Sequence, residues 1–260
     1  MIIKRANDNR YVAEDENGRQ IGSCAVIRQV QPRIFPDRPV QYVIRVKCTD
    51  ECRDLLYGAA VTRARILASK ETEPCRVYAD IDASAKEDIE LIQALGFHVR
   101  DGIMRMRREV TDERVSVPAP PSCTIVRDFL ENPEELKKCL RRYNECFGVN
   151  YNESWLENIA SMPDFARILM VSPEGLCGEA MVWSRGDTGV VGIIQTARAW
   201  RRQGVATYLM EDARKYFSSL KLKHMTFDAW VLAPGCVPLA RKCGYRKGEM
   251  LTIYPELRMG

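Results

Sequence analysis

Apolar and polar residues alternate in a two-residue rhythm in several stretches of the first third of the chain, which predicts β-strands. The stretch 10–30 carries Glu16, Asn17 and Gly18 near its centre and therefore predicts a hairpin, and strand patterns follow at 41–47 and 75–82. Between the last two stretches, residues 50–69 carry apolar side chains at helical spacing. The apolar face expected for that helix comprises Leu55, Leu56, Ala59, Ala60, Ile66 and Leu67.

The same reading predicts where further helices begin and end. Ser84 and Glu87 match the reciprocal capping pattern of a helix start, and Gly96 matches a helix end. Asn132 followed by Pro133 predicts a helix cap and a first helical residue. The pattern then predicts helices over 154–160, 205–220 and 238–243, and strands over 123–129, 166–172, 176–184, 188–196, 225–231 and 248–254.

Residues 111–122 separate the chain into two pieces of similar size. This segment is polar and then proline-rich, and its three prolines remove backbone donors and favour an extended chain. We therefore expect a linker there, between domains over 1–110 and 123–260. Each piece runs through strand, long helix and strand, and ends in a helix, a glycine–aromatic pair and a strand. This weak internal repeat favours two copies of one α/β (α+β) fold over two unrelated α/β pieces.

Composition narrows the class of protein. The 260 residues include 39 basic and 35 acidic side chains, and this net charge of +4 is too balanced to indicate nucleic-acid binding. The N-terminus has no apolar leader and no run approaches the roughly 18 apolar residues of a membrane span, so we expect a cytoplasmic protein without a membrane partner. Its ten cysteines are then expected to be reduced. Cys48 and Cys52 lack a second pair at zinc-site spacing, and the only histidines are His98 and His224, so we expect no metal.

The junction before the helix at 205–220 carries the most specific chemical signal. The first turn of a helix presents backbone N–H groups without internal partners, at the positive end of the helix dipole, and so attracts phosphate. Gly204 lets a phosphate approach the main chain, Arg201 and Arg202 add positive charge, and Gln203 adds an amide. The alternative is a solvated turn with surface arginines. The apolar strand before the turn and the amphipathic helix after it favour a pyrophosphate site.

At this junction the sequence resembles a known family. R201-x-x-G204-x-A206 resembles the acyl-CoA pyrophosphate motif of the GNAT N-acetyltransferase superfamily, and IIQTARAW before it resembles that family's fourth strand and the following turn. Downstream, Pro238-Leu239 and Gly244-Tyr245 fall where many members have Pro-Leu-Tyr and then Gly-Phe.

The resemblance implies two tandem GNAT-like domains, each with a mixed, mostly antiparallel sheet flanked by helices. It covers essentially all of 123–260, whereas 1–110 resemble the fold in outline only. The first half has no glycine loop at its strand-to-helix junction, and Asp50 and Glu51 there would repel phosphate. The first half thus resembles a degenerate copy without cofactor. As a hypothesis from the repeat, it packs against the second half as an internal pseudo-dimer and borders the acceptor groove, and the oligomeric state stays open.

For the second half the resemblance implies acetyl-CoA as co-substrate. The backbone at Ile194, Gln195 and Thr196 would hydrogen-bond the pantetheine arm, and one N–H there would polarise the thioester carbonyl. A primary amine of a small molecule or peptide would attack that carbonyl directly. The pyrophosphate would lie on the amides of Arg202, Gln203, Gly204, Val205, Ala206 and Thr207, with Arg201 at the rim.

A general base must remove the amine proton, and two carboxylates are candidates. Glu179 and Asp228 are acids within apolar strands, where burial would raise the pKa of either side chain. The alternative for each is a solvent-facing position on an alternating strand.

The general acid is the point at which the sequence departs from the family. Members often have asparagine or serine where Ala233 stands and a tyrosine acid where Ala240 stands. A CoA thiolate, with a thiol pKa of about 8.5, leaves fairly well without an acid. Tyr254 and Cys243 are the substitutes to test, with packing on the sheet as the alternative for Tyr254.

The function expected from the resemblance is acetyl transfer to an amine. Tyr151, Trp155 and Trp183 are candidates for lining the acceptor site, with core packing as the alternative. Aminoglycosides, polyamines, amino acids and peptides all stay open as acceptors, as does a longer acyl donor. The rival function is a non-catalytic CoA-binding or regulatory GNAT-like protein, which Ala233 and Ala240 favour. Nucleic-acid binding through the arginines near position 200 is disfavoured because the cluster is short.

Overall fold

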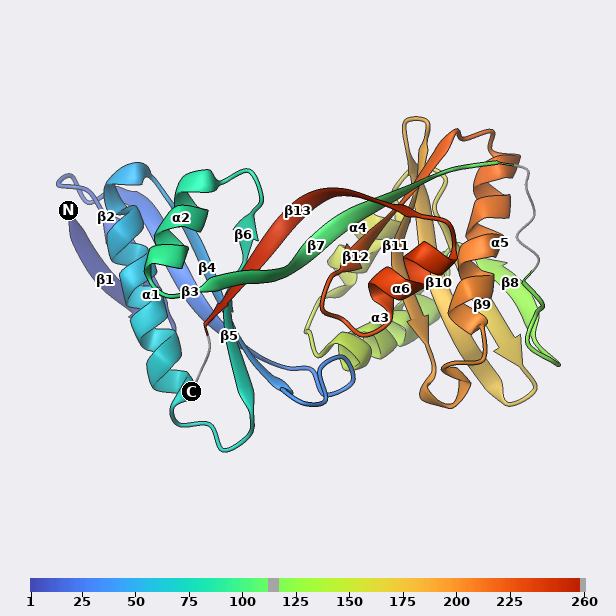
Figure 1. Cartoon of the computed structure of the whole chain (residues 1–260), viewed down its shortest axis with the longest axis horizontal. Helices are drawn as coiled ribbons and strands as arrows, with labels where there is room; N and C mark the ends of the chain where they lie inside the picture. The colour runs from blue at the N-terminus through green and yellow to red at the C-terminus, as the bar shows by residue number, and fades with distance from the viewer. Residues whose placement is uncertain (112–116, 258–260) are drawn as a thin grey trace. The chain divides into compact units, whose positions relative to one another are not determined.

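The computed structural model describes residues 1–111 and 117–257, and the chain divides into two compact units (Figure 1). Each unit contains residues from both halves of the sequence. Unit 1 comprises Met1–Ile103, Trp230–Pro234 and the chain from Met250, and unit 2 comprises Met104–Ala229 and Gly235–Glu249.

The expected linker at 111–122 is only partly visible. Residues 112–116 lie outside the described residues, and residues 117–120 belong to no helix or strand. The division into domains over 1–110 and 123–260 therefore stays a prediction.

Unit 1 is built on a sheet that α1 and α2 cover on one face (Figure 1). The hairpin expected at Gly18 is present, and the Asp15 carboxylate closes it by accepting from the amides of Asn17 and Arg19. Neighbouring strands are antiparallel except for β4 and β5, which are parallel and flank α1. The elements are β1 (Ile2–Asn7), β2 (Arg10–Glu14), β3 (Gln20–Val30), β4 (Val40–Cys48), a 3-10 turn (Asp50–Cys52), α1 (Arg53–Ala68), β5 (Cys75–Ala79), β6 (Ile81–Asp82) and α2 (Lys86–Ala94).

Two local predictions for unit 1 are wrong. Leu55 and Ile66 are 51% and 42% exposed, because the buried face of α1 is rotated toward Leu56, Tyr57, Ala60, Val61, Ala64 and Ala68. Ser84 does not cap α2, since its hydroxyl donates to Asp82 at 2.6 Å and no side chain caps the helix start.

Unit 2 has a sheet covered on both faces. The helices α3 and α4 pack on one face and α5 and α6 on the other. The expected cap of α3 is confirmed, because Asn132 Oδ1 accepts from the Glu134 amide at 2.9 Å and Pro133 follows it. The elements are β8 (Thr124–Asp128), α3 (Pro133–Phe147), α4 (Glu153–Ala160), β9 (Ala166–Ser172), β10 (Gly175–Arg185), β11 (Thr188–Thr196), a 3-10 turn (Arg198–Trp200), α5 (Val205–Ser219), β12 (His224–Trp230) and α6 (Cys236–Lys242).

Two long strands, β7 (His98–Glu109) and β13 (Arg246–Leu257), each contribute to both units. In unit 1, β13 pairs with β5 and β6, with Glu256 opposite Tyr78 and Ile253 opposite Ile81. In unit 2, β7 lies beside β12. The strand order is β1-β2-β3-β4-β5-β13-β7-β12-β11-β10-β9-β8, with β6 on β13.

The architecture confirms the predicted fold class of a mixed, mostly antiparallel sheet flanked by helices. The repeat is also present, since β4, α1 and β5 follow the same strand, helix and parallel-strand order as β11, α5 and β12. No helix in the described part of the chain is long and apolar enough to cross a membrane.

Candidate functional site

The parallel pairing between β11 and β12 stops partway along both strands. Its register runs from Thr188 opposite His224 to Val191 opposite Phe227. Beyond that point β11 continues to Thr196 and β12 to Trp230. On its other edge β11 stays paired with β10 as far as Thr196. Among the described strand pairs, the end of β11 therefore has one edge without a partner, and such an edge can bind an extended chain.

A β-bulge at Gly192 marks the place where the pairing stops. The β10–β11 register shifts between Met181 and Val182, which lie opposite Ile193 and Val191, so Gly192 is the extra residue. Bulges bend a strand and increase its twist. A Cβ at Gly192 would lie 1.7 Å from Cη2 of Trp183, so only glycine leaves room for this indole ring. Trp183 thus packs over the bulge that redirects β11.

The first turn of α5 is open. Gly204 is the N-terminal cap residue, with φ of 87°, and a Cβ there would meet nothing within 4 Å. No side chain among the described residues caps the helix, and its first turn contains no acidic residue. The first-turn amides of Val205, Ala206 and Thr207 therefore face no protein side-chain acceptor, in the environment that attracts anions.

The side chains around this turn divide into two groups. Arg201 and Arg202 are exposed, whereas Val205 and Thr207 are buried and offer only their backbone. The Gln203 side chain is engaged, because its Nε2 donates to the Ala199 carbonyl at 2.8 Å. The structure thus places the predicted phosphate-binding residues together at the start of α5, one 3-10 turn after the unpaired edge of β11.

Glu179 lies in a buried ionic network, which rules out the alternative of a solvent-facing position for it. Its side chain is 0% exposed and stands opposite Gln195, which donates to its Oε1. Arg167 contacts Glu179 Oε2 through Nε at 2.6 Å and Nη2 at 2.5 Å, and reaches Asp128 at 2.9 Å. Arg142 of α3 approaches Glu179 Oε1 to 3.5 Å. The network ties β8, β9, β10 and β11 together.

Asp228 is held differently. Its two carboxylate oxygens accept from Nε and Nη2 of Arg105 on β7, at 2.9 and 3.0 Å. The Asp228 side chain is 29% exposed, so one side of the carboxylate can be reached from solvent.

The candidate acids are poorly suited to their role. Tyr254 lies in unit 1, with its ring centroid 5.0 Å from Tyr78 and 5.7 Å from Trp230, and burial raises the pKa of its phenol. Burial raises the pKa of the Cys243 thiol to about 11. Efficient acids have pKa values near the working pH. Tyr254 is also separated from the candidate bases, because it belongs to unit 1 whereas Glu179 and Asp228 belong to unit 2.

The aromatic residues expected at the acceptor site lie in two places. Tyr151 and Trp155 stack at 4.3 Å beside Tyr143, and the Asn144 side chain holds the Tyr151 backbone at 2.9 and 3.0 Å. Trp183 lies at the bulge instead. Their role in binding an acceptor stays a prediction.

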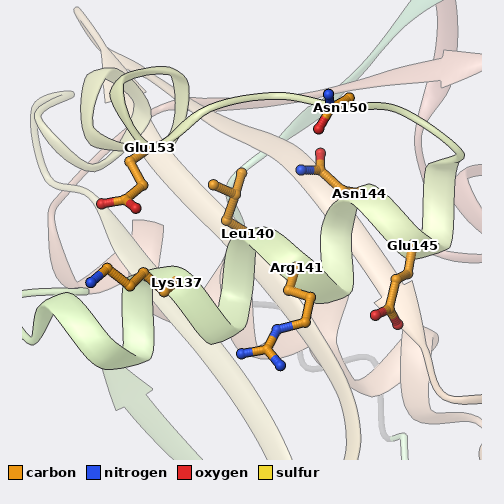
Figure 2. Close-up of a pocket in the computed structure, with 7 residues that line it drawn as sticks. All are labelled: Lys137, Leu140, Arg141, Asn144, Glu145, Asn150 and Glu153. Atoms are coloured by element: carbon orange, nitrogen blue, oxygen red, sulfur yellow. The ribbon is translucent and has the colours of Figure 1, made fainter.

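Next to this stack is a pocket of about 350 Å³ along α3 and the start of α4 (Figure 2). It contains none of the residues of β11 or of the α5 turn, so it is separate from the unpaired strand edge. Its lining residues are Lys137, Leu140, Arg141, Asn144, Glu145, Asn150 and Glu153.

Sequence reasoning missed the arginines that hold the two carboxylates. Arg167 interrupts an apolar strand in the same way as Glu179, and that shared signal could have suggested a buried pair. Arg105 belongs to the other half of the sequence, and no local pattern connects it to Asp228.

Neither a family model nor a curated protein matches the sequence. Solved structures do match the fold. A GCN5-related N-acetyltransferase from Sphaerobacter thermophilus aligns with a TM-score of 0.54 at 16% identity, over 99% of this chain and 83% of that one. A tandem GNAT protein from the clavulanic acid biosynthesis pathway aligns with a TM-score of 0.50 at 13% identity, over 96% and 83%.

A third structure, from Enterococcus faecalis V583, is named a conserved protein of unknown function and probable N-acyltransferase. It aligns with a TM-score of 0.57 at 13% identity, over 94% of this chain and 61% of that one. This chain therefore has the fold of the GCN5-related N-acetyltransferases, in a tandem arrangement.

Proposed function

We propose that this protein is an N-acetyltransferase that moves an acetyl group from acetyl-CoA to a primary amine. The observation that supports this most directly is the succession of two features: the unpaired edge of β11 is followed, after one 3-10 turn, by the uncapped first turn of α5. CoA joins an extended pantetheine arm to a diphosphate, and these two parts match the unpaired strand edge and the uncapped helix turn in the same order.

In this proposal the chain binds acetyl-CoA mainly through its backbone. The amides from Arg202 to Thr207 bind the diphosphate, and the exposed guanidiniums of Arg201 and Arg202 add positive charge at the rim. The free edge at Ile194, Gln195 and Thr196 binds the pantetheine arm as an added strand. The buried Glu179–Gln195 hydrogen bond holds this end of β11 in place.

The chemistry needs a group that accepts the proton of the attacking amine. Asp228 is our proposed base, because its carboxylate is partly exposed on the strand that faces the unpaired edge of β11, whereas Glu179 is fully enclosed. The amine attacks the thioester carbonyl, Asp228 takes its proton, and CoA leaves as a thiolate. Because that thiol has a pKa of about 8.5, the step proceeds without a dedicated acid.

Asp228→Asn tests the proposed base. We expect kcat to fall by about a hundredfold or more, the range that general bases supply, while the affinity for CoA stays the same. Thiol release in the presence of a panel of amines measures kcat, and titration calorimetry measures the affinity for CoA. Unchanged turnover would assign the proton transfer to another group, and CoA binding by the wild type without turnover on any amine would favour a non-catalytic CoA-binding protein.

Gly204→Glu tests the cofactor site itself. It places an anion at the proposed diphosphate position, and we expect the affinity for CoA to fall by about a hundredfold or more, which corresponds to about 3 kcal/mol. Gly186→Glu is the matched control, because Gly186 also has a positive φ and open space around it but lies at the other end of β11. Titration calorimetry with CoA measures the affinity. An equal loss in both variants, or none in either, would refute the proposed site.

A further inference from the structure

We propose that Asp101 of β7 is a positioning residue for the end of β12, and through it for the arm of the acyl-CoA. This inference rests on the function proposed above. It begins from a structural problem: the last three residues of β12, from Asp228 to Trp230, have lost their partners on β11. Some other group must set their position.

Hydrogen bonds from β7 hold the end of β12 and the residues that follow it. Asp101 Oδ2 accepts from Trp230 Nε1 at 2.8 Å, and its Oδ1 accepts from the Leu232 amide at 3.0 Å. The neighbouring Gly102 carbonyl accepts from the Val231 amide at 2.9 Å. One carboxylate thus fixes both the last side chain of β12 and the backbone that follows it.

The anchor is itself rigidly supported. Asp101 is buried, and Arg76, which is 1% exposed, contacts it at 2.8 Å and contacts Glu256 at 2.8 Å. The Arg76 guanidinium also lies over the Tyr78 ring at 4.6 Å. The Trp230 ring packs edge-on against Phe35 at 4.9 Å. Buried charges are retained only where partners compensate them, so Asp101 has little freedom to move.

β7 also holds β12 at Asp228, before its last residue. Arg105 grips Asp228 through two hydrogen bonds, four residues along β7 from Asp101. Residues at even spacing on a strand project from the same face, so the two contacts act from one side of β7. β7 is therefore the strand that defines the end of β12, from the edge opposite the proposed arm of the acyl-CoA.

A purely stabilising role and a positioning role make different predictions. If Asp101 only stabilises the fold, its loss should weaken all ligands alike or none. If it positions the end of β12, its loss should weaken binding of the pantetheine arm and leave binding at the diphosphate site on α5 unaffected. CoA and its nucleotide portion, 3′-phosphoadenosine 5′-diphosphate, are the two probes that separate these roles.

The experiment uses the full chain with Asp101→Ala, the milder Asp101→Asn, and Glu256→Gln as the matched control. Glu256 shares Arg76 with Asp101 but, among the described residues, forms no hydrogen bond or ion pair with residues 230–232. Calorimetry gives the Kd for both probes, and hydrogen exchange reports on the Leu232 amide. Urea unfolding shows how far each variant is destabilised.

For Asp101→Ala we expect the Kd for CoA to rise about tenfold, the effect of losing hydrogen bonds to a charged group, with the Kd for the nucleotide within about twofold of wild type. Leu232 exchange should accelerate. The Kd of Asp101→Asn for CoA should lie between those of Asp101→Ala and wild type. Glu256→Gln should change neither Kd, even where it lowers stability.

Equal weakening of both probes, or the same pattern in Glu256→Gln, would overturn the positioning role while leaving the proposed function intact. An Asp101→Asn variant that folds and binds CoA like wild type would overturn it too. A wild-type protein that binds neither probe would refute the proposed function and this inference together.

Discussion

Arg167 and Glu179 form a buried ion pair in unit 2, and the two residues lie on different strands. Arg167 and Glu179 are 2% and 0% exposed, and besides each other Arg167 contacts Asp128, while Glu179 contacts Gln195 and Arg142. Removing one member of such a pair leaves the other as an uncompensated charge in an apolar environment. At the residue scale Glu179 is therefore a structural link between strands, and its effect on activity follows from holding Gln195.

Glu179→Ala should lower the free energy of unfolding by about 3 to 5 kcal/mol, the usual consequence of breaking a buried ion pair. Glu145→Ala is the control, because Glu145 is exposed on the same unit and should change stability by less than about 0.5 kcal/mol. Urea unfolding monitored by circular dichroism measures both. A Glu179→Ala protein as stable as the control would show that the network contributes little.

Contacts between residues close in sequence could be predicted from the sequence, whereas contacts between distant segments could not. The Asn132 cap was readable because both its partner and its proline lie within two residues. Ser84 matched a capping pattern equally well, but Asp82 competes for its hydroxyl. The turn at Gly204 could be read from the sequence as a helix start, whereas the partners of Glu179 and Asp228 come from distant strands and have no local signature.

Periodicity predicted most of the elements, and one glycine explains the most consequential of their irregularities. The β11 pattern reads as an unbroken strand, yet Gly192 is bulged under Trp183 and the pairing with β12 ends beside it. The buried face of α1 was misassigned because half of its buried residues are alanines, so the bulkier Leu55 and Ile66 drew the prediction to the wrong side.

Gly192→Ala should destabilise the protein by about 1 to 3 kcal/mol, because the added methyl group overlaps the Trp183 ring. Trp183→Leu in the same chain should recover part of that loss, since the smaller side chain leaves room for the methyl group. A double-mutant cycle measured by thermal unfolding gives the coupling energy. Additive effects of the two substitutions would mean that the ring does not set the bulge.

At the scale of the whole molecule, neither unit is encoded by one continuous segment. Unit 1 takes Trp230–Pro234 and the chain from Met250, and unit 2 takes the part of β7 that begins at Met104. The repeat is visible in the sequence pattern, but the exchange is not, because β7 and β13 have the patterns of ordinary terminal strands of their own halves.

A cut between the halves should therefore leave them joined. A specific protease site inserted at 117–121, followed by cleavage, should yield a protein that elutes in gel filtration like the uncut chain and separates only in denaturant. Residues 123–260 expressed alone should fold poorly, because they lack β7. Separation of the cut halves under native conditions, or a stable and fully active 123–260 fragment, would contradict this expectation.

The exchange of β13 has a consequence for how the protein is made. Translation delivers β5 to the exit of the ribosome long before Glu256, which pairs opposite Tyr78 near the end of the chain. The nascent first half therefore has an unfilled strand position until β13 has been synthesised, and exposed strand edges invite aggregation. Folding of unit 1 is thus coupled to the synthesis of β13, so a product truncated before Arg246 carries an incomplete sheet and is recognisable to quality control.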